Sequence, residues 1–228
     1  MKKPSWLLIV LVILLMSTSP VFSASSVGSV SVSADEAINL LTSGNNRFVS
    51  ESYSHPDIGQ ARIAELSKGQ YPFAVIVTCS DSRVPPELLF DQGLGDLFVV
   101  RTAGNTIDDI ALGSVEYAVE HLGVHLVLVL GHDECGAVKA TIAGGKAEGH
   151  IDAIVQQIKP ALAAAKTKQG DLLTNTIVEN VDLVVSRLQT SQPILANNIE
   201  SGKIKIVGGV YNFTNGLVTL RPVKKPSN

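Results

Sequence analysis

The run Phe-Ala-Val-Ile-Val-Thr at residues 73–78, followed by Cys-Ser-Asp-Ser-Arg at residues 79–83, decides the fold of this 228-residue chain. Five apolar residues and a threonine in succession, without alternation, predict a strand that is buried on both faces. Such strands are typical of parallel sheets, which helices cover on both sides. The polar residues that follow then stand at the carboxyl end of the strand, where open α/β sheets bind their ligands.

The same pattern continues downstream. Residues 97–100 and 124–130 are further apolar runs of strand length, and residues 108–122 between them have helical apolar spacing, including Ile110 and Tyr117. Pro85-Pro86 opens a short helix after the first strand, and residues 135–142 begin another after the third. Alternating strands and helices predict the α/β fold class, with a central, mainly parallel sheet flanked by helices.

The rest of the chain extends this domain. Further helices are predicted from Ser33, at residues 60–66, 151–166, 174–188 and 194–201, with Gly44 interrupting the first. Residues 204–211 and 217–220 are predicted to form a terminal strand pair joined by Asn215-Gly216, a hairpin turn signal. No internal repeat or linker is visible, so residues 34–228 are predicted to form one domain.

The N-terminal segment has the pattern of an export signal. Two lysines precede the apolar run at residues 6–16, and small residues follow near Ala24. This pattern predicts a signal peptide at residues 1–23 and a flexible tail at residues 24–33. An apolar run of about eleven residues is too short for a membrane anchor. We therefore expect a periplasmic or secreted protein with no membrane association after cleavage of the signal.

Composition excludes some classes of function. Hydrophobic residues make up 45% of the chain, which is enough for a buried core and argues against disorder. The formal net charge is -3, and no basic face of the kind that binds phosphates is evident. Aromatic residues make up only 5%, so a stacking platform for single strands is also missing. We expect no nucleic-acid partner.

The two cysteines of the chain, Cys79 and Cys135, allow more than one interpretation. In an exported protein, two cysteines ordinarily predict one disulfide. A cysteine at a strand end is also often only a small buried hydrophobic residue. Here, however, both lie at the carboxyl ends of predicted parallel strands, and His132 lies three residues before Cys135. Two thiolates and an imidazole form a catalytic zinc set that leaves a fourth position for water.

Four stretches of the chain carry a family resemblance. Residues 73–87 resemble the first signature of the β-class carbonic anhydrases. Gly-Asp-Leu-Phe-Val-Val-Arg-Thr-Ala-Gly-Asn at residues 95–105 and Gly-His-Asp-Glu-Cys-Gly-Ala-Val at residues 131–138 are similar to later blocks of that family. Gly-Asn-Asn-Arg-Phe at residues 44–48 is similar to its N-terminal motif. The similarity extends from about Ala34 to the C-terminus and includes no departure from the motifs.

The resemblance implies both an activity and a site. It implies zinc-dependent, reversible hydration of carbon dioxide to bicarbonate and a proton, through attack by a hydroxide held on the zinc. It implies Cys79, His132 and Cys135 as zinc ligands, and Asp81 with Arg83 as a catalytic dyad. Asp81 is also expected as a fourth zinc ligand at lower pH, when the site is closed. The family forms dimers and higher assemblies, so a homodimer or larger homo-oligomer is expected.

The chemistry of Asp81 and Arg83 agrees with that role. An ionised carboxylate only accepts hydrogen bonds, so Asp81 would accept the proton of the hydroxide and direct a lone pair at carbon dioxide. Arg83 would hold the carboxylate through a bidentate pair. The alternative for these two residues is a solvated salt bridge in a loop.

Other functions remain open on this fold. One is hydrolysis of carbonyl sulfide or carbon disulfide, which differs only in access to the pocket. A second is a non-catalytic protein that binds zinc or bicarbonate, although such a protein needs no Asp81–Arg83 dyad. An exported redox protein is a third, but the chain lacks a C-x-x-C pair. The sequence does not choose a proton carrier among His55, His121, His125 and His150.

Overall fold

The structure is a computed structural model, and it describes residues 32–222. The predicted signal peptide and residues 24–31 of the predicted tail lie outside this range. The last two residues of that tail are attached to the domain. The side chain of Ser33 caps the first helix by accepting from the backbone N–H of Glu36, and the Val32 carbonyl lies 3.1 Å from Nδ1 of His125.

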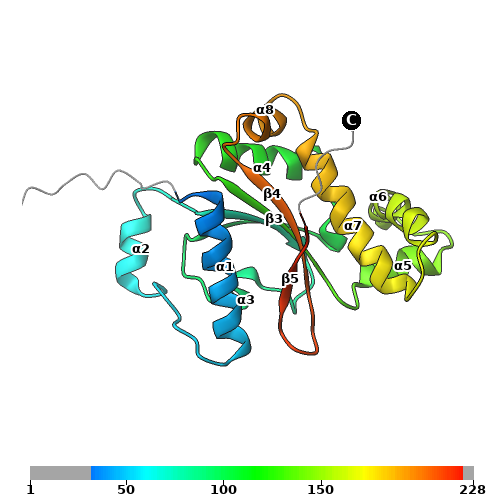
Figure 1. Cartoon of the computed structure of the whole chain (residues 1–228), viewed down its shortest axis with the longest axis horizontal. Coiled ribbons are helices and arrows are strands. Elements are labelled where there is room, and N and C mark those ends of the chain that lie inside the picture. Colours follow the sequence, from blue (N-terminus) through cyan, green and yellow to red (C-terminus); the bar gives the residue numbers. More distant parts are fainter. Residues whose placement is uncertain (1–31, 223–228) are drawn as a thin grey trace, which may run out of the picture. The chain divides into compact units, whose positions relative to one another are not determined.

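Helices and strands alternate through the middle of the chain, as the sequence predicts (Figure 1). In order they are α1 (Ala34–Val49), α2 (Gln60–Leu66), β1 (Ala74–Cys79), α3 (Pro86–Leu89), β2 (Leu97–Thr102), the 3-10 turn η1 (Ala103–Asn105), α4 (Asp109–His121), β3 (Leu126–His132), α5 (Gly136–Ala143), α6 (Ile151–Ala165), α7 (Leu172–Gln189), α8 (Ile194–Glu200), β4 (Lys205–Tyr211) and β5 (Val218–Leu220). Among residues 32–222, no helix has the length and apolarity needed to cross a membrane.

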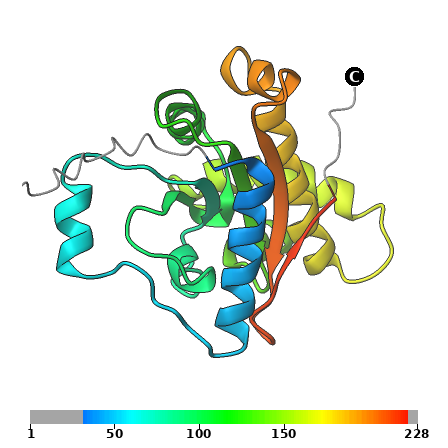
Figure 2. The ribbon, with the colours of Figure 1, turned by 60° about the vertical axis from the view of Figure 1, so that its left-hand side comes forward.

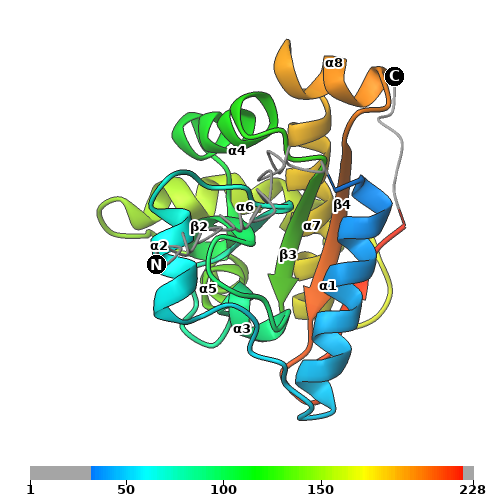
Figure 3. The ribbon, with the colours of Figure 1, turned by 90° about the vertical axis from the view of Figure 1, so that its left-hand side faces the viewer.

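The strands form a single sheet in the order β2-β1-β3-β4-β5. The first four strands are parallel, and β5 is antiparallel to β4. This confirms the predicted α/β fold with a central, mainly parallel sheet. The parallel arrangement brings the carboxyl ends of β1 and β3 to the same edge of the sheet, and Figure 3 shows β3 and β4 running side by side.

Helices cover both faces of the sheet, so every residue of β1 and β3 is buried. Successive side chains of a strand point to opposite faces. Val75 and Val77 of β1 pack with residues of α4, α7 and α8, whereas Ala74 and Ile76 pack with α1 and α3. Figure 2 shows α1 in front of β4 and α7 behind it. Burial on two faces explains why these strands read as unbroken apolar runs.

Two glycines let α7 approach the sheet closely. A Cβ atom on Gly131 of β3 would lie 2.6 Å from Cγ2 of Val181, and one on Gly208 of β4 would lie 2.7 Å from Cγ1 of the same valine. Carbon atoms pack comfortably at about 3.5–4.0 Å, so neither position has room for a side chain. The glycine before His132 therefore has a packing function in the helix–sheet contact.

Three local expectations differ from the structure. Helix α1 continues through Gly44 because that glycine lies against α3, where an added Cβ would be 1.7 Å from the carbonyl oxygen of Phe90. On α4, Ile110 is 83% exposed and Tyr117 is 47% exposed, although both belong to the apolar residues of the helix. Only one side of α4 contacts the sheet, so periodicity alone overestimates the buried face.

The connection between β4 and β5 is longer than the two-residue hairpin turn that Asn215-Gly216 predicts. It occupies residues 212–217, and the side chain of Asn212 accepts hydrogen bonds from the backbone N–H groups of Thr214 and Asn215. Gly216 alone of the Asn-Gly pair takes a positive φ, 73°. The strand pairing itself is confirmed.

Candidate active site and metal centre

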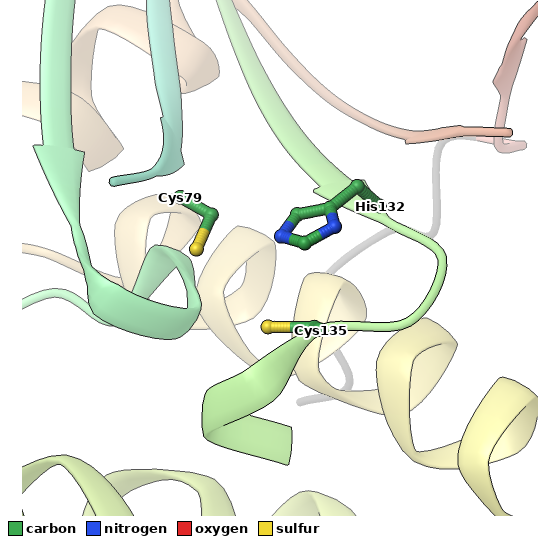
Figure 4. A group of neighbouring side chains, drawn as sticks. All are labelled: Cys79, His132 and Cys135. Carbon is green, nitrogen blue, oxygen red and sulfur yellow. The ribbon is translucent and has the colours of Figure 1, made fainter. Parts of the chain in front are cut away.

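Three buried side chains converge at the carboxyl edge of the sheet (Figure 4). Cys79 is the last residue of β1, His132 is the last residue of β3, and Cys135 is the N-cap of α5. One ligand atom from each, two sulfurs and an imidazole nitrogen, all lie within 4.8 Å of one another. The convergence follows from two parallel strands that end at the same edge.

The donor set fits a zinc ion. Nδ1 of His132 is 2.7 Å from the carbonyl oxygen of Asp133, which can only accept, so Nδ1 carries the proton. The lone pair of the imidazole is then on Nε2, which is buried and has no hydrogen-bond partner in the described part of the chain. Both cysteines are buried free thiols. A neutral imidazole oriented by a carbonyl, together with two sulfurs, is a typical zinc environment.

One hydrogen bond joins the two thiols, and it shifts their pKa values in opposite directions. The hydrogen bond from Cys135 lowers the pKa of Cys79 against the opposing effect of burial, with help from His132 and from the backbone N–H groups of Asp81 and Gly104. The same hydrogen bond and burial raise the pKa of Cys135. Backbone N–H groups at the start of α5 oppose that rise only in part. One thiol of the pair therefore loses its proton readily, and a cation between the sulfurs would favour loss of the proton from the other thiol.

Asp81 and Arg83 form a close pair beside this cluster. Nε of Arg83 donates to Oδ1 of Asp81 at 2.9 Å, and Nη2 donates to Oδ2 at 2.7 Å. The backbone N–H of Arg83 also donates to Oδ1 at 2.9 Å. These bonds from Arg83 hold the pKa of the Asp81 carboxyl well below its usual range, although desolvation opposes them. Asp81 also lies next to the three clustered side chains, since its Oδ2, which accepts from Nη2 of Arg83, is 3.9 Å from Nε2 of His132.

Asp81 is thus bound to Arg83 in this structure and is not among the three clustered ligands. Its expected second state, as a fourth zinc ligand, requires release of the Arg83 hydrogen bonds and stays a prediction. Of the other histidines, His55 stacks on Tyr53 and His121 lies against Tyr117.

Two further residues of the site were not identified as site residues from the sequence. Arg101 at the end of β2 donates from Nε to the carbonyl oxygen of Cys79 at 3.0 Å and from Nη2 to that of Asp81 at 2.6 Å. Phe213, in the loop between β4 and β5, lies under the guanidinium of Arg83 at 4.2 Å and beside the ring of His132 at 5.3 Å. Arg101 belongs to the motif at residues 95–105, but its two carbonyl partners can be identified only from the folded structure.

Comparisons with known proteins agree with this geometry. Residues 74–218 match the family model described as Carbonic anhydrase. The chain is 43% identical over 189 residues to a carbonic anhydrase of Mycolicibacterium smegmatis, covering 81% of this chain and 92% of that relative. It is 40% identical over 189 residues to carbonic anhydrase 2 of Mycobacterium tuberculosis, covering 81% and 91%.

Solved structures agree as well. The β-carbonic anhydrase CcaA superposes with a TM-score of 0.64 at 27% identity, over 81% of this chain and 94% of that one. The Coccomyxa β-carbonic anhydrase, solved in complex with acetazolamide, superposes with a TM-score of 0.65 at 27% identity, over 78% and 83%.

The parallel sheet and the Cys-His-Cys donor set define the class of the protein, a zinc enzyme of the α/β type. Within that class, the chain belongs to the β-carbonic anhydrase family. Its activity is the zinc-dependent hydration of carbon dioxide to bicarbonate, which makes it a lyase.

Proposed function

We propose that Cys79, His132 and Cys135 hold the zinc ion and that Asp81 and Arg83 orient the reacting oxygen. The observation that carries this proposal is the buried Nε2 of His132, which has no hydrogen-bond partner among residues 32–222 and lies within 4.8 Å of two free sulfurs. When bound there, zinc would lower the pKa of a water molecule in its fourth position and so supply the nucleophile near neutral pH.

Asp81 would accept a hydrogen bond from a water held there. Its depressed pKa keeps the carboxylate ionised, and an ionised carboxylate can only accept. Such a water would therefore point a hydrogen at Asp81, which would leave an oxygen lone pair free to face carbon dioxide. Arg83 fixes the angle of the carboxylate through its two guanidinium bonds, and Phe213 supports the guanidinium from below. The side chains together hold the orientation that the reaction needs.

Stopped-flow hydration of carbon dioxide, combined with zinc analysis, tests these roles. Cys79→Ser and His132→Ala should both lose zinc and activity. Asp81→Asn should retain zinc but lose most of the activity, because the amide can donate to the water and reverse its orientation. Arg83→Ala should lower activity by releasing the carboxylate toward the metal. The matched control is Asp152→Asn, an exposed carboxylate on α6, which should leave both measurements unchanged. Full zinc content in both ligand variants would refute the ligand assignment, and normal turnover in both dyad variants would reduce the dyad to a loop salt bridge.

We also propose that the protein is exported and works in the periplasm or outside the cell. Support comes from the sequence alone, from Lys2-Lys3, the apolar run at residues 6–16 and the small residues that precede Ala24. N-terminal sequencing of the protein recovered from cell fractions checks this proposal. A protein that retains residues 1–23 and stays inside the cell would refute it.

We further infer that the enzyme is a homo-oligomer. Strand β2 is at one end of the sheet order, so one of its edges pairs with no other strand of residues 32–222 and could accept a further strand. Large apolar side chains are also exposed, among them Ile63 at 48%, Tyr71 at 67% and Leu88 at 58%. The Sordaria macrospora β-carbonic anhydrases, which share the fold with a TM-score of 0.64 at 22% identity, are tetrameric. Sedimentation equilibrium measures the mass directly, and a monomer at micromolar concentration would refute the inference.

A further inference from the structure

A buried asparagine lies behind the candidate metal centre. Asn180 is on α7 and is only 1% exposed, next to apolar residues of that helix such as Ile177 and Val181. Its Nδ2 donates to the carbonyl oxygen of Gly104 at 2.8 Å, whereas its Oδ1 has no hydrogen-bond partner among residues 32–222. Burying an amide with one polar atom unpaired costs free energy. An apolar side chain would avoid that cost, so packing alone does not explain this asparagine.

The partner of Asn180 contacts the metal site directly. The backbone N–H of Gly104 donates to Sγ of Cys79 at 3.2 Å. Gly104 therefore accepts from Asn180 on one side and donates to a candidate zinc ligand on the other. Because Asn180 and Gly104 are 76 residues apart in the chain, this link joins α7 to the metal site across the core.

The turn that contains Gly104 needs support from outside. Gly104 has a φ of 70° and Asn105 has a φ of 44°, so two successive residues are in the left-handed region. This region is unfavourable for a residue other than glycine. The turn is also tightly packed, since a Cβ on Gly104 would be 2.8 Å from Cδ1 of Ile158 and 2.9 Å from Cβ of Ala137. The hydrogen bond from Asn180 fixes Gly104, a residue whose N–H reaches the sulfur.

We propose that Asn180 is a positioning residue of the metal centre, which holds Gly104 so that its N–H stays bonded to the sulfur of Cys79. This inference rests on the proposed function of Cys79 as a zinc ligand. A hydrogen bond to a ligand sulfur withdraws negative charge from it and fixes its direction. Without Asn180, the turn relaxes, the N–H···S bond weakens, and the sulfur becomes more electron-rich and less well directed.

Asn180→Leu tests the proposal, because leucine is of similar size and cannot donate. Its matched control is Val184→Ala on the same helix. Val184 is buried, and its apolar side chain cannot form a hydrogen bond to Gly104. Both variants should lose some stability in thermal unfolding. In the cobalt-substituted proteins, only Asn180→Leu should shift the sulfur-to-cobalt charge-transfer band to longer wavelength. Competition with a chelator should show metal binding about 10-fold weaker in Asn180→Leu, at the lower end of the range for such outer contacts.

A band position and a metal affinity in Asn180→Leu equal to those of Val184→Ala would overturn the inference. A second measurement needs no variant. In the wild-type protein loaded with ¹¹³Cd, the amide proton of Gly104 should show a scalar coupling to cadmium through the sulfur. Absence of that coupling in the loaded protein would also overturn the inference. A wild-type protein that binds neither cobalt nor cadmium through its thiols would instead refute the proposed ligand set, so the two failures are distinguishable.

Discussion

Adding one methyl group between β3 and α7 should destabilise the fold, and the structure gives the size of the effect. In Gly131→Ala, the new carbon would be 2.6 Å from Cγ2 of Val181, about 1 Å closer than carbon atoms normally pack. Val181 is fully buried, and its side chain is too short to move aside without moving the helix. Overpacking of this kind costs about 1–3 kcal/mol.

A second substitution should reverse part of that loss. Val181→Ala removes two methyl groups at about 0.8 kcal/mol each and leaves a small cavity, so by itself it should cost roughly 2 kcal/mol. In the double variant, the methyl group added at position 131 occupies space that Cγ2 has vacated. The combined loss should therefore be smaller than the sum of the single losses by about 1–2 kcal/mol, as is typical of residues in direct contact.

Urea unfolding of the metal-free, reduced protein at one protein concentration measures these free energies. The matched control is Gly113→Ala, since an added Cβ at this exposed position in the middle of α4 meets no atom within 4 Å. That variant should gain about 0.5–1 kcal/mol, because alanine is the better helix former. If Gly131→Ala were as stable as the wild type, or if the two losses were additive, the close contact between β3 and α7 would be refuted. Zinc affinity should also fall in Gly131→Ala, since the next residue is His132.

Three further predictions concern charge, redox state and pH. Burial acts to raise the pKa of Asp91, but hydrogen bonds from Ser54, Arg47 and His55 lower it overall. Asp91→Ala should therefore cost about 1–3 kcal/mol near neutral pH. The wild-type advantage should be full above about pH 4, the unfolded pKa, and shrink as the pH falls toward the folded pKa; an advantage equal at pH 6 and pH 2 in urea melts would contradict it. In the zinc-free protein, oxidised glutathione should take two electrons from Cys79 and Cys135, forming their disulfide and two molecules of reduced glutathione. Thiol counting and zinc reloading with and without reductant check this, and two retained thiols would show that the loops keep the sulfurs apart. Hydration activity should rise from neutral to alkaline pH. The reason is that a zinc ion whose charge is neutralised by two thiolates lowers the pKa of its bound water less than a zinc ion with neutral ligands would. A flat stopped-flow profile would count against this.

Much of the fold could be predicted because the decisive signals are local. An unbroken apolar run predicts a strand buried on both faces, and β1 and β3 are buried at every position. The polar residues of the site are the last residues of these strands or follow them within a few positions. Since parallel strands end at one edge of a sheet, the sequence also predicted that Cys79, His132 and Cys135 converge, and the structure places them together.

Where local signals misled, the reason was a tertiary contact. Gly44 is of a residue type that often ends a helix, yet a glycine is required at this position because α1 touches Phe90 there. Ile110 has the spacing of a buried residue, yet it is 83% exposed, because the described part of the chain covers little of it. Asn215-Gly216 has the composition of a tight turn, yet the side chain of Asn212 organises a longer loop. In each case, the neighbour that decides the outcome is not visible in the local pattern.

The sequence by itself determined the class of fold and pointed to the three side chains of the candidate metal site and the Asp81–Arg83 pair, because strand periodicity and short motifs encode them within a few residues. The tertiary structure alone decided what surrounds them. Arg101 reaches the carbonyls of β1 only because β2 pairs with β1, and Phe213 reaches Arg83 only because the loop after β4 returns to the site. Asn180 meets Gly104 only because α7 packs against the sheet with that face inward. Such contacts depend on how elements far apart in the chain are rotated and docked, and no local pattern of residues specifies that geometry.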